Sequence, residues 1–150
     1  MSPDQVAALR AQLIVDEGLR LKPYRDSVGK LTIGVGRNLD DKGISHDEAM
    51  ALLDRDIAEH TALLDRELPW WQRMDETRQL VLANMAFNLG VGPTPEQPEG
   101  KLLQFKNTLD HMARGEYDAA ADGMAASVWA KQVGVRADRL VVAMRTGAFA

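Results

Sequence analysis

The sequence predicts an α+β protein that is mainly helical and carries one small β-hairpin near its N-terminus. Two patterns indicate this fold class. Apolar residues recur at helical spacing through most of the 150 residues. Between about residues 23 and 36, strand-forming residues instead flank a short turn that contains serine and glycine. The length fits a single domain with a buried core.

The first predicted helix begins after Ser2, which forms a capping-box pattern with Gln5. Gly18 ends it, because glycine is the favoured residue directly after a helix. The apolar face of this helix includes Leu13. Four residues further on, the same face reaches Glu17, so we expect a carboxylate at the end of an apolar face.

Residues 23–26 and 31–36 predict the two strands of the hairpin, with Gly29 in the turn. Asp26 ends the first strand and Thr32 lies near the start of the second. Because a hairpin pairs these strand positions, we expect the two side chains to lie close together. Folding the hairpin back against the first helix would bring the carboxylate at the end of that helix to the same place.

The rest of the chain predicts loops and helices. Ser45 and Glu48 form a second capping box, which opens a long helix that closes before Pro69. Loops are predicted where glycine, proline, asparagine and aspartate gather, at residues 38–43 and 91–100. Further helices are predicted at residues 75–90 and at about 102–113, 118–126 and 136–145.

Composition and charge exclude several classes of function. The formal net charge of −4 argues against nucleic-acid binding. A chain without cysteine forms no disulfides and no thiolate metal sites. His46, His60 and His111 lack the paired spacing of a zinc motif and are expected on helix surfaces. We therefore expect no metal and no cofactor.

The N-terminus has neither the basic nor the apolar region of a secretory signal. No stretch approaches the roughly 18 apolar residues that a membrane span needs. These features predict a protein that stays in the cytoplasm where it is made until something else releases it.

Two carboxylates in unlike surroundings are what the hydrolysis of a glycosidic bond requires. Glu17 is the candidate that partial burial keeps protonated, because burial disfavours the charged form. Asp26 is the candidate that stays ionised, and Thr32 could hold a water molecule between them. The spacing alone leaves a plainer interpretation open, in which Glu17 is a surface charge and Asp26 a turn residue.

A family resemblance favours the catalytic interpretation. Residues 16–26, followed by Gly29 and by residues 32–36, resemble the active-site segment of phage-type lysozymes, the endolysins similar to the lysozyme of T-even phages. The two carboxylates and the threonine keep the spacing of that family. The resemblance continues in order through residues 84–90, 105–109 and 136–147.

The resemblance implies a lysozyme-like fold, with residues 1–150 as one domain and a monomeric protein. A small N-terminal lobe with the hairpin would comprise about residues 16–45. A long helix, about residues 45–66, would connect it to a larger helical lobe of about residues 67–150, which would also include the N-terminal helix.

The resemblance also implies an activity. Phage-type lysozymes are muramidases, which hydrolyse the β-1,4 bond between N-acetylmuramic acid and N-acetylglucosamine and so lyse the bacterial wall for phage release. Glu17 would be the general acid, Asp26 the base or stabilising carboxylate, and Thr32 the holder of the attacking water. The family is usually described as inverting, which places the two carboxyl groups roughly 6.5–9.5 Å apart.

Three further residues match family positions around the sugar cleft. Phe87 and Thr108 match positions that line the cleft, and Arg136 matches an arginine that pairs with the catalytic glutamate. A nearby cation favours the ionised acid, so either bound sugar must desolvate Glu17 or Arg136 must pair elsewhere. Plainer interpretations place Phe87 in the core and Arg136 on the surface.

The chain departs from the family pattern in the residue after the hairpin and in both rims of the cleft. The connection from Gly36 to Ser45 is short, so we expect one rim to be trimmed. Family members commonly carry histidine after the last hairpin glycine, where this chain has Arg37. Arginine allows an ion pair there but not a titrating one. The loop at residues 90–100 is longer and richer in proline, so we expect this rim to be extended.

Two alternative functions stay open. A lytic transglycosylase needs the acid but no water-activating aspartate, and it releases 1,6-anhydro products. A non-catalytic glycan-binding module on the same fold would be indicated by a lost carboxylate, and neither carboxylate is lost. The partners implied are peptidoglycan and a holin-type permeabiliser, which would release the enzyme from the host cytoplasm to the wall.

Overall fold

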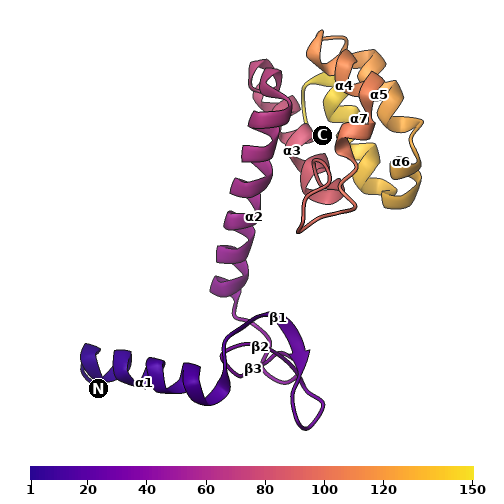
Figure 1. Cartoon of the computed structure of the whole chain (residues 1–150). Helices are drawn as coiled ribbons and strands as arrows, with labels where there is room; N and C mark the ends of the chain where they lie inside the picture. Colours follow the sequence, from indigo (N-terminus) through magenta and orange to yellow (C-terminus); the bar gives the residue numbers. More distant parts are fainter. The chain divides into compact units, whose positions relative to one another are not determined.

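The computed structural model describes all 150 residues of the chain. The chain divides into two compact units, residues 1–52 and residues 53–150. Most elements are helices, and the first unit holds a small antiparallel sheet (Figure 1). The predicted α+β class with a mainly helical chain is therefore confirmed. None of the helices combines the length and the apolar character that a membrane crossing needs.

The first unit begins with helix α1 (Pro3–Glu17). Its capping box forms as predicted: the Gln5 amide donates to Ser2 Oγ at 3.2 Å, and the Ser2 amide donates to Gln5 Oε1 at 2.8 Å. Gly18 ends the helix with φ +77°, a conformation that favours glycine. The assignment of this helix to the larger lobe stays a prediction.

Strands β1 (Arg20–Arg25), β2 (Leu31–Gly34) and β3 (Arg37–Asn38) form an antiparallel sheet in that order. The predicted hairpin is confirmed by β1 and β2, although β1 begins at Arg20, three residues before the predicted start. The predictions did not include β3. Positive φ angles at Gly34 and Gly36 turn the chain back on itself, so that two residues pair with β2.

Helix α2 (His46–Glu67) begins in the first unit and ends in the second. Its predicted capping box is confirmed, because the Ser45 amide donates to Glu48 Oε2 at 2.8 Å and the Glu48 amide donates to Ser45 Oγ at 3.1 Å. The helix ends before Pro69, as predicted.

After α2, the second unit contains helices and loops but no strand. It contains, in order, the 3-10 helix η1 (Pro69–Arg73), α3 (Glu76–Leu89), the 3-10 helix η2 (Leu102–Gln104), α4 (Lys106–Ala113), α5 (Tyr117–Ala125), α6 (Val128–Val133) and α7 (Val135–Thr146). Helix α7 packs against α3, α5 and α6, and α5 also packs against α4. Leu82, Met85 and Met124 are among the fully buried side chains of this core.

Two predictions for the second unit were incomplete. The helix expected at about 102–113 is broken at Phe105, whose ψ of 52° is not helical. Helix α6 was not predicted, because its six residues are too few to show a periodic apolar face. Ser127 caps the start of this short helix and Gly134 follows its end.

Residues 90–100 form the predicted irregular loop. Its two ends meet at a neck, where Gly90 and Gly92 lie against Gly100. A Cβ atom on Gly90 would lie 2.9 Å from the Cα atom of Gly100. A Cβ atom on Gly100 would overlap the backbone carbonyl of Gly92. The Leu102 amide donates to the Gly90 carbonyl at 2.9 Å, which holds the two ends of the loop together.

Candidate active site

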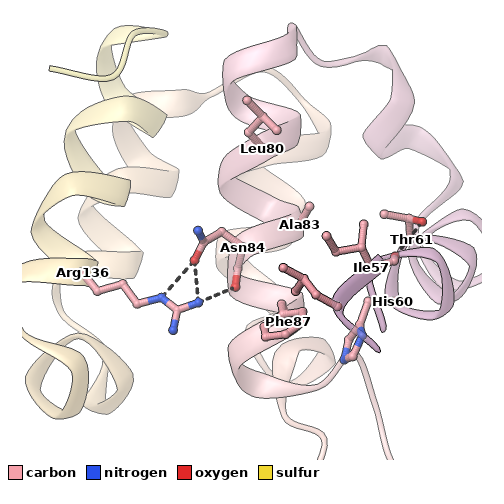
Figure 2. A pocket seen from close by; sticks show the side chains of 9 residues that line it. Ile57, His60, Thr61, Leu80, Ala83, Asn84, Phe87 and Arg136 are labelled. Atoms are coloured by element: carbon pink, nitrogen blue, oxygen red, sulfur yellow. Dashed lines mark hydrogen bonds between the residues drawn. The ribbon is translucent and has the colours of Figure 1, made fainter. Parts of the chain in front are cut away.

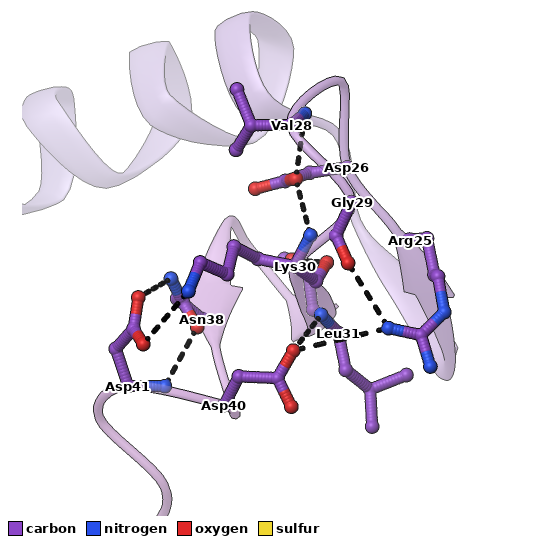
Figure 3. Close-up of polar contacts among 10 residues, drawn as sticks. Arg25, Asp26, Val28, Gly29, Lys30, Leu31, Asn38, Asp40 and Asp41 are labelled. Carbon is purple, nitrogen blue, oxygen red and sulfur yellow. Dashed lines mark hydrogen bonds and ion pairs between the residues drawn. The ribbon is translucent and has the colours of Figure 1, made fainter.

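Asp26 lies directly after β1, in the turn of the hairpin (Figure 3). Its Oδ1 atom accepts the Val28 amide at 3.0 Å and the Lys30 amide at 2.8 Å. Its own amide donates to the Lys30 carbonyl at 2.9 Å. The turn therefore fixes the carboxylate through one oxygen, while Oδ2 accepts no hydrogen bond from the chain.

Thr32 lies on β2, where it pairs with Tyr24 of β1 and Asn38 of β3. Its side chain is buried, and its hydroxyl donates to the Lys30 carbonyl at 2.9 Å. That carbonyl also accepts the Asp26 amide. The backbone of Lys30 thus joins the two predicted site residues of the hairpin, and the lone pairs of the Thr32 hydroxyl stay available to accept a hydrogen bond.

A polar network outside the turn anchors Lys30. Its ammonium group contacts Asp41 Oδ1 at 3.1 Å, and Asn38 Nδ2 donates to Asp41 Oδ2 at 2.9 Å (Figure 3). These hydrogen bonds lower the pKa of Asp41, and the bond with Asp41 raises the pKa of Lys30. Exposed pairs of this kind add little stability, but they fix the residue that joins Asp26 and Thr32.

Glu17 is the last residue of α1, and its side chain lies against Gly36. A Cβ atom on Gly36 would be 2.8 Å from Glu17 Oε2 and 3.3 Å from Glu17 Cγ. Glu17 makes no hydrogen bond to Asp26 or Thr32. Its side chain is exposed, so the expected partial burial is not present.

Arg136 and Phe87 line one pocket of about 320 Å³ in the second unit (Figure 2). Arg136 of α7 donates to the side-chain oxygen of Asn84 on α3, through Nε at 3.0 Å and Nη2 at 2.8 Å. Phe87 is 38% exposed, which makes its ring accessible from this pocket. Asn84 was not predicted, because a contact between residues 52 positions apart leaves no local pattern.

Thr108 does not line this pocket. Its side chain is buried, with the hydroxyl packed against Gly123 of α5. The structure therefore gives the predicted sugar contact of Thr108 no support, and that role stays a prediction.

His60 of α2 is half-buried and packs against Phe87 of α3. Its Nδ1 atom is 2.6 Å from the Asp56 carbonyl, its Nε2 atom is buried without a partner, and its ring centre is 5.3 Å from that of Phe87. A histidine on a long polar helix gives no sequence signal of this packing, because Phe87 belongs to another helix.

The fold and the carboxylate-bearing hairpin are those expected of a lysozyme-type glycosidase. Comparison with known families establishes this class, because the family model described as phage lysozyme matches residues 15–144. The protein therefore belongs to the phage lysozyme family. The resemblance inferred from the motifs is confirmed.

Individual relatives support the same placement. The chain is 26% identical to the probable T4-type lysozyme 1 of Dictyostelium discoideum, over 95% of this chain and 96% of the relative. It is 32% identical to the SAR-endolysin of Escherichia phage Mu, over 81% of this chain and 66% of that protein. It is 29% identical to the pre-baseplate central spike protein Gp5 of Enterobacteria phage T4, of which it spans 26%.

Proposed function

We propose that this protein is a muramidase that hydrolyses the β-1,4 bond between N-acetylmuramic acid and N-acetylglucosamine in bacterial peptidoglycan, with inversion at the anomeric carbon. Membership of the phage lysozyme family supports a lysozyme, and the endolysin relative supports peptidoglycan as the substrate. The proposal of this specific reaction rests on how the hairpin holds the carboxylate of Asp26. One oxygen of Asp26 is fixed by two backbone amides, and the other is free to receive a proton.

In the proposed reaction, ionised Asp26 accepts a proton from a water molecule through its free oxygen. The hydroxyl of Thr32 offers its lone pairs to the other hydrogen of that water. The water oxygen bonds to the anomeric carbon of the muramic acid unit, and the glycosidic bond breaks. Glu17 gives its proton to the departing oxygen, which becomes the free hydroxyl of the glucosamine unit.

The exposure of Glu17 sets a condition on this proposal. Because the side chain of Glu17 is exposed, the proposal requires bound sugar to exclude water from the carboxyl group. Within the second unit, Arg136 is bonded to Asn84. Phe87 and Arg136, which line one pocket, remain proposed substrate contacts.

Analysis of the products on purified peptidoglycan tests the reaction itself. We expect new reducing-end muramic acid, and we expect proton NMR to show the α anomer first, because an inverting enzyme converts a β bond into an α hemiacetal. A 1,6-anhydro product would instead identify a lytic transglycosylase. An initial β anomer would contradict inversion while leaving hydrolysis in place.

Asp26→Asn is expected to lower turnover by roughly 10²–10⁴-fold, because an amide cannot accept the proton of the attacking water. The asparagine oxygen can still accept the two backbone amides, so the hairpin should keep its structure. The release of reducing ends measures the effect. Asp54→Asn, at an exposed position of α2, is the matched control and should leave turnover unchanged. Full activity of Asp26→Asn would show that this carboxylate is not needed.

The setting of the activity is part of the proposal. The endolysin relative supports a role in lysis of the host wall at phage release. We propose that the enzyme is made in the host cytoplasm, acts as a monomer, and reaches the wall after a holin-type protein has permeabilised the inner membrane.

A further inference from the structure

Gly36 is shaped to receive the carboxyl group of Glu17. Its missing side chain leaves the space that Glu17 Oε2, Cδ and Cγ fill, all within 3.3 Å of where a Cβ atom would stand. Its φ of +62° is a second reason for glycine at this position. The acid therefore lies on a bare stretch of backbone, between β2 and β3.

The residue after Gly36 is tied to the start of α2. Arg37 holds the Glu48 carboxylate with both terminal nitrogens, Nη2 to Oε1 at 2.9 Å and Nη1 to Oε2 at 3.4 Å. Glu48 Oε2 also accepts the Ser45 amide at 2.8 Å. Arg37 pairs with Ile33 across the sheet. The backbone beside Gly36 is thus fixed both by β2 and by the first turn of α2.

We propose that Gly36, held in place by the Arg37–Glu48 ion pair, is a positioning residue that orients the carboxyl group of Glu17 for proton donation. This inference rests on the proposed role of Glu17 as the general acid. The acid makes no hydrogen bond to another site residue, so contact with Gly36 is what limits the directions in which its carboxyl group points. Arg37 and Glu48 act through Gly36 and do not touch the substrate.

The surroundings of Glu48 favour the charged form that the ion pair needs. The Ser45 amide and, to a smaller degree, Arg37 lower the pKa of Glu48 below its ordinary value. The carboxylate therefore stays charged in mildly acidic solution. An arginine held by both terminal nitrogens also has a fixed direction, which a lysine would not provide.

The first test compares Gly36→Ala with Gly43→Ala. Gly43 is a matched control, because its φ is +63° and the nearest atom to a new Cβ would be 3.9 Å away, in ordinary contact. Both variants carry the same backbone strain, so we expect similar losses of Tm. Only Gly36→Ala displaces the acid. We expect its kcat on solubilised peptidoglycan to fall about 100-fold, the cost of misplacing a catalytic group by about 1 Å, with little change in KM.

The second test removes the ion pair and leaves glycine in place. Arg37→Met and Glu48→Gln should each lower kcat about tenfold with KM nearly constant, and the double variant should lose no more than either single one. Arg37→Lys should recover part of the loss. Arg55→Met, which breaks the exposed Arg55–Glu59 pair of the same helix, is the control and should keep full activity.

The outcomes separate this proposal from the proposed function. If Glu17→Gln is inactive while Gly36→Ala and Arg37→Met match their controls in kcat, the positioning role is wrong and the muramidase assignment stands. If the losses appear in KM, or follow Tm in all variants including the controls, the role of these residues is structural and the proposal is overturned. Activity of Glu17→Gln would instead contradict the proposed function.

Discussion

Glu17→Gln is expected to abolish clearing of a peptidoglycan suspension while leaving the fold intact. General acid catalysis contributes roughly 10²–10⁴-fold to rate, and an amide has no proton of comparable acidity to give. The side chain is exposed and takes part in no ion pair or hydrogen bond of the chain, so the free energy of unfolding should change by less than about 0.5 kcal/mol. Turbidity and circular dichroism measure the two effects.

Asp16→Asn is the matched control for this substitution. Asp16 is the neighbouring exposed acid of α1, and the change removes the same charge from the same helix turn. Its clearing activity should equal that of the wild type. Retained activity in Glu17→Gln would refute the role of Glu17. A wild-type protein that binds peptidoglycan without clearing it would indicate the non-catalytic glycan-binding alternative.

Gly100→Ala is expected to cause the largest loss of stability among single methyl additions. The new Cβ would overlap the backbone of Gly92, which no side-chain rotation can relieve. Forcing extra atoms into a packed region costs about 1–3 kcal/mol, and backbone contact should place this variant near the upper end. The free energy of unfolding from urea denaturation measures the effect.

Gly115→Ala serves as the comparison for the loop neck. Gly115 has a φ of +73° with open space around it, so alanine there should cost about 1 kcal/mol through backbone strain alone. If the free energy of unfolding of Gly100→Ala is no lower than that of this control, the backbone at the neck of the 90–100 loop can move to accept a methyl group. The contact between its glycines then does not hold the loop closed.

The sequence was most informative where structure depends on neighbours along the chain. Both capping boxes formed as predicted, because Ser2 with Gln5 and Ser45 with Glu48 are each three residues apart. Strand β3 was missed because two residues show no alternation, and its pairing depends on turns at two glycines.

The candidate site divides in the same way. Asp26 and Thr32 are not partners across the hairpin, because Thr32 pairs with Tyr24, but each bonds to the backbone of Lys30. The exposure of Glu17 agrees with the plainer interpretation that the spacing left open, whereas the bond between Asn84 and Arg136 was not predicted. Asn84 and Arg136 belong to helices far apart in the sequence, and helix periodicity reports only which face of a helix is apolar.

The groups proposed for the chemistry all lie between Glu17 and Gly36, within the first unit. The entropy lost in closing a loop grows with the logarithm of its length. Contacts within so short a stretch therefore cost little conformational entropy and form quickly. The hairpin turn that fixes Asp26 closes over only four residues. We therefore expect amide protons of this turn to gain protection early in refolding, before the helices that follow α2 have assembled.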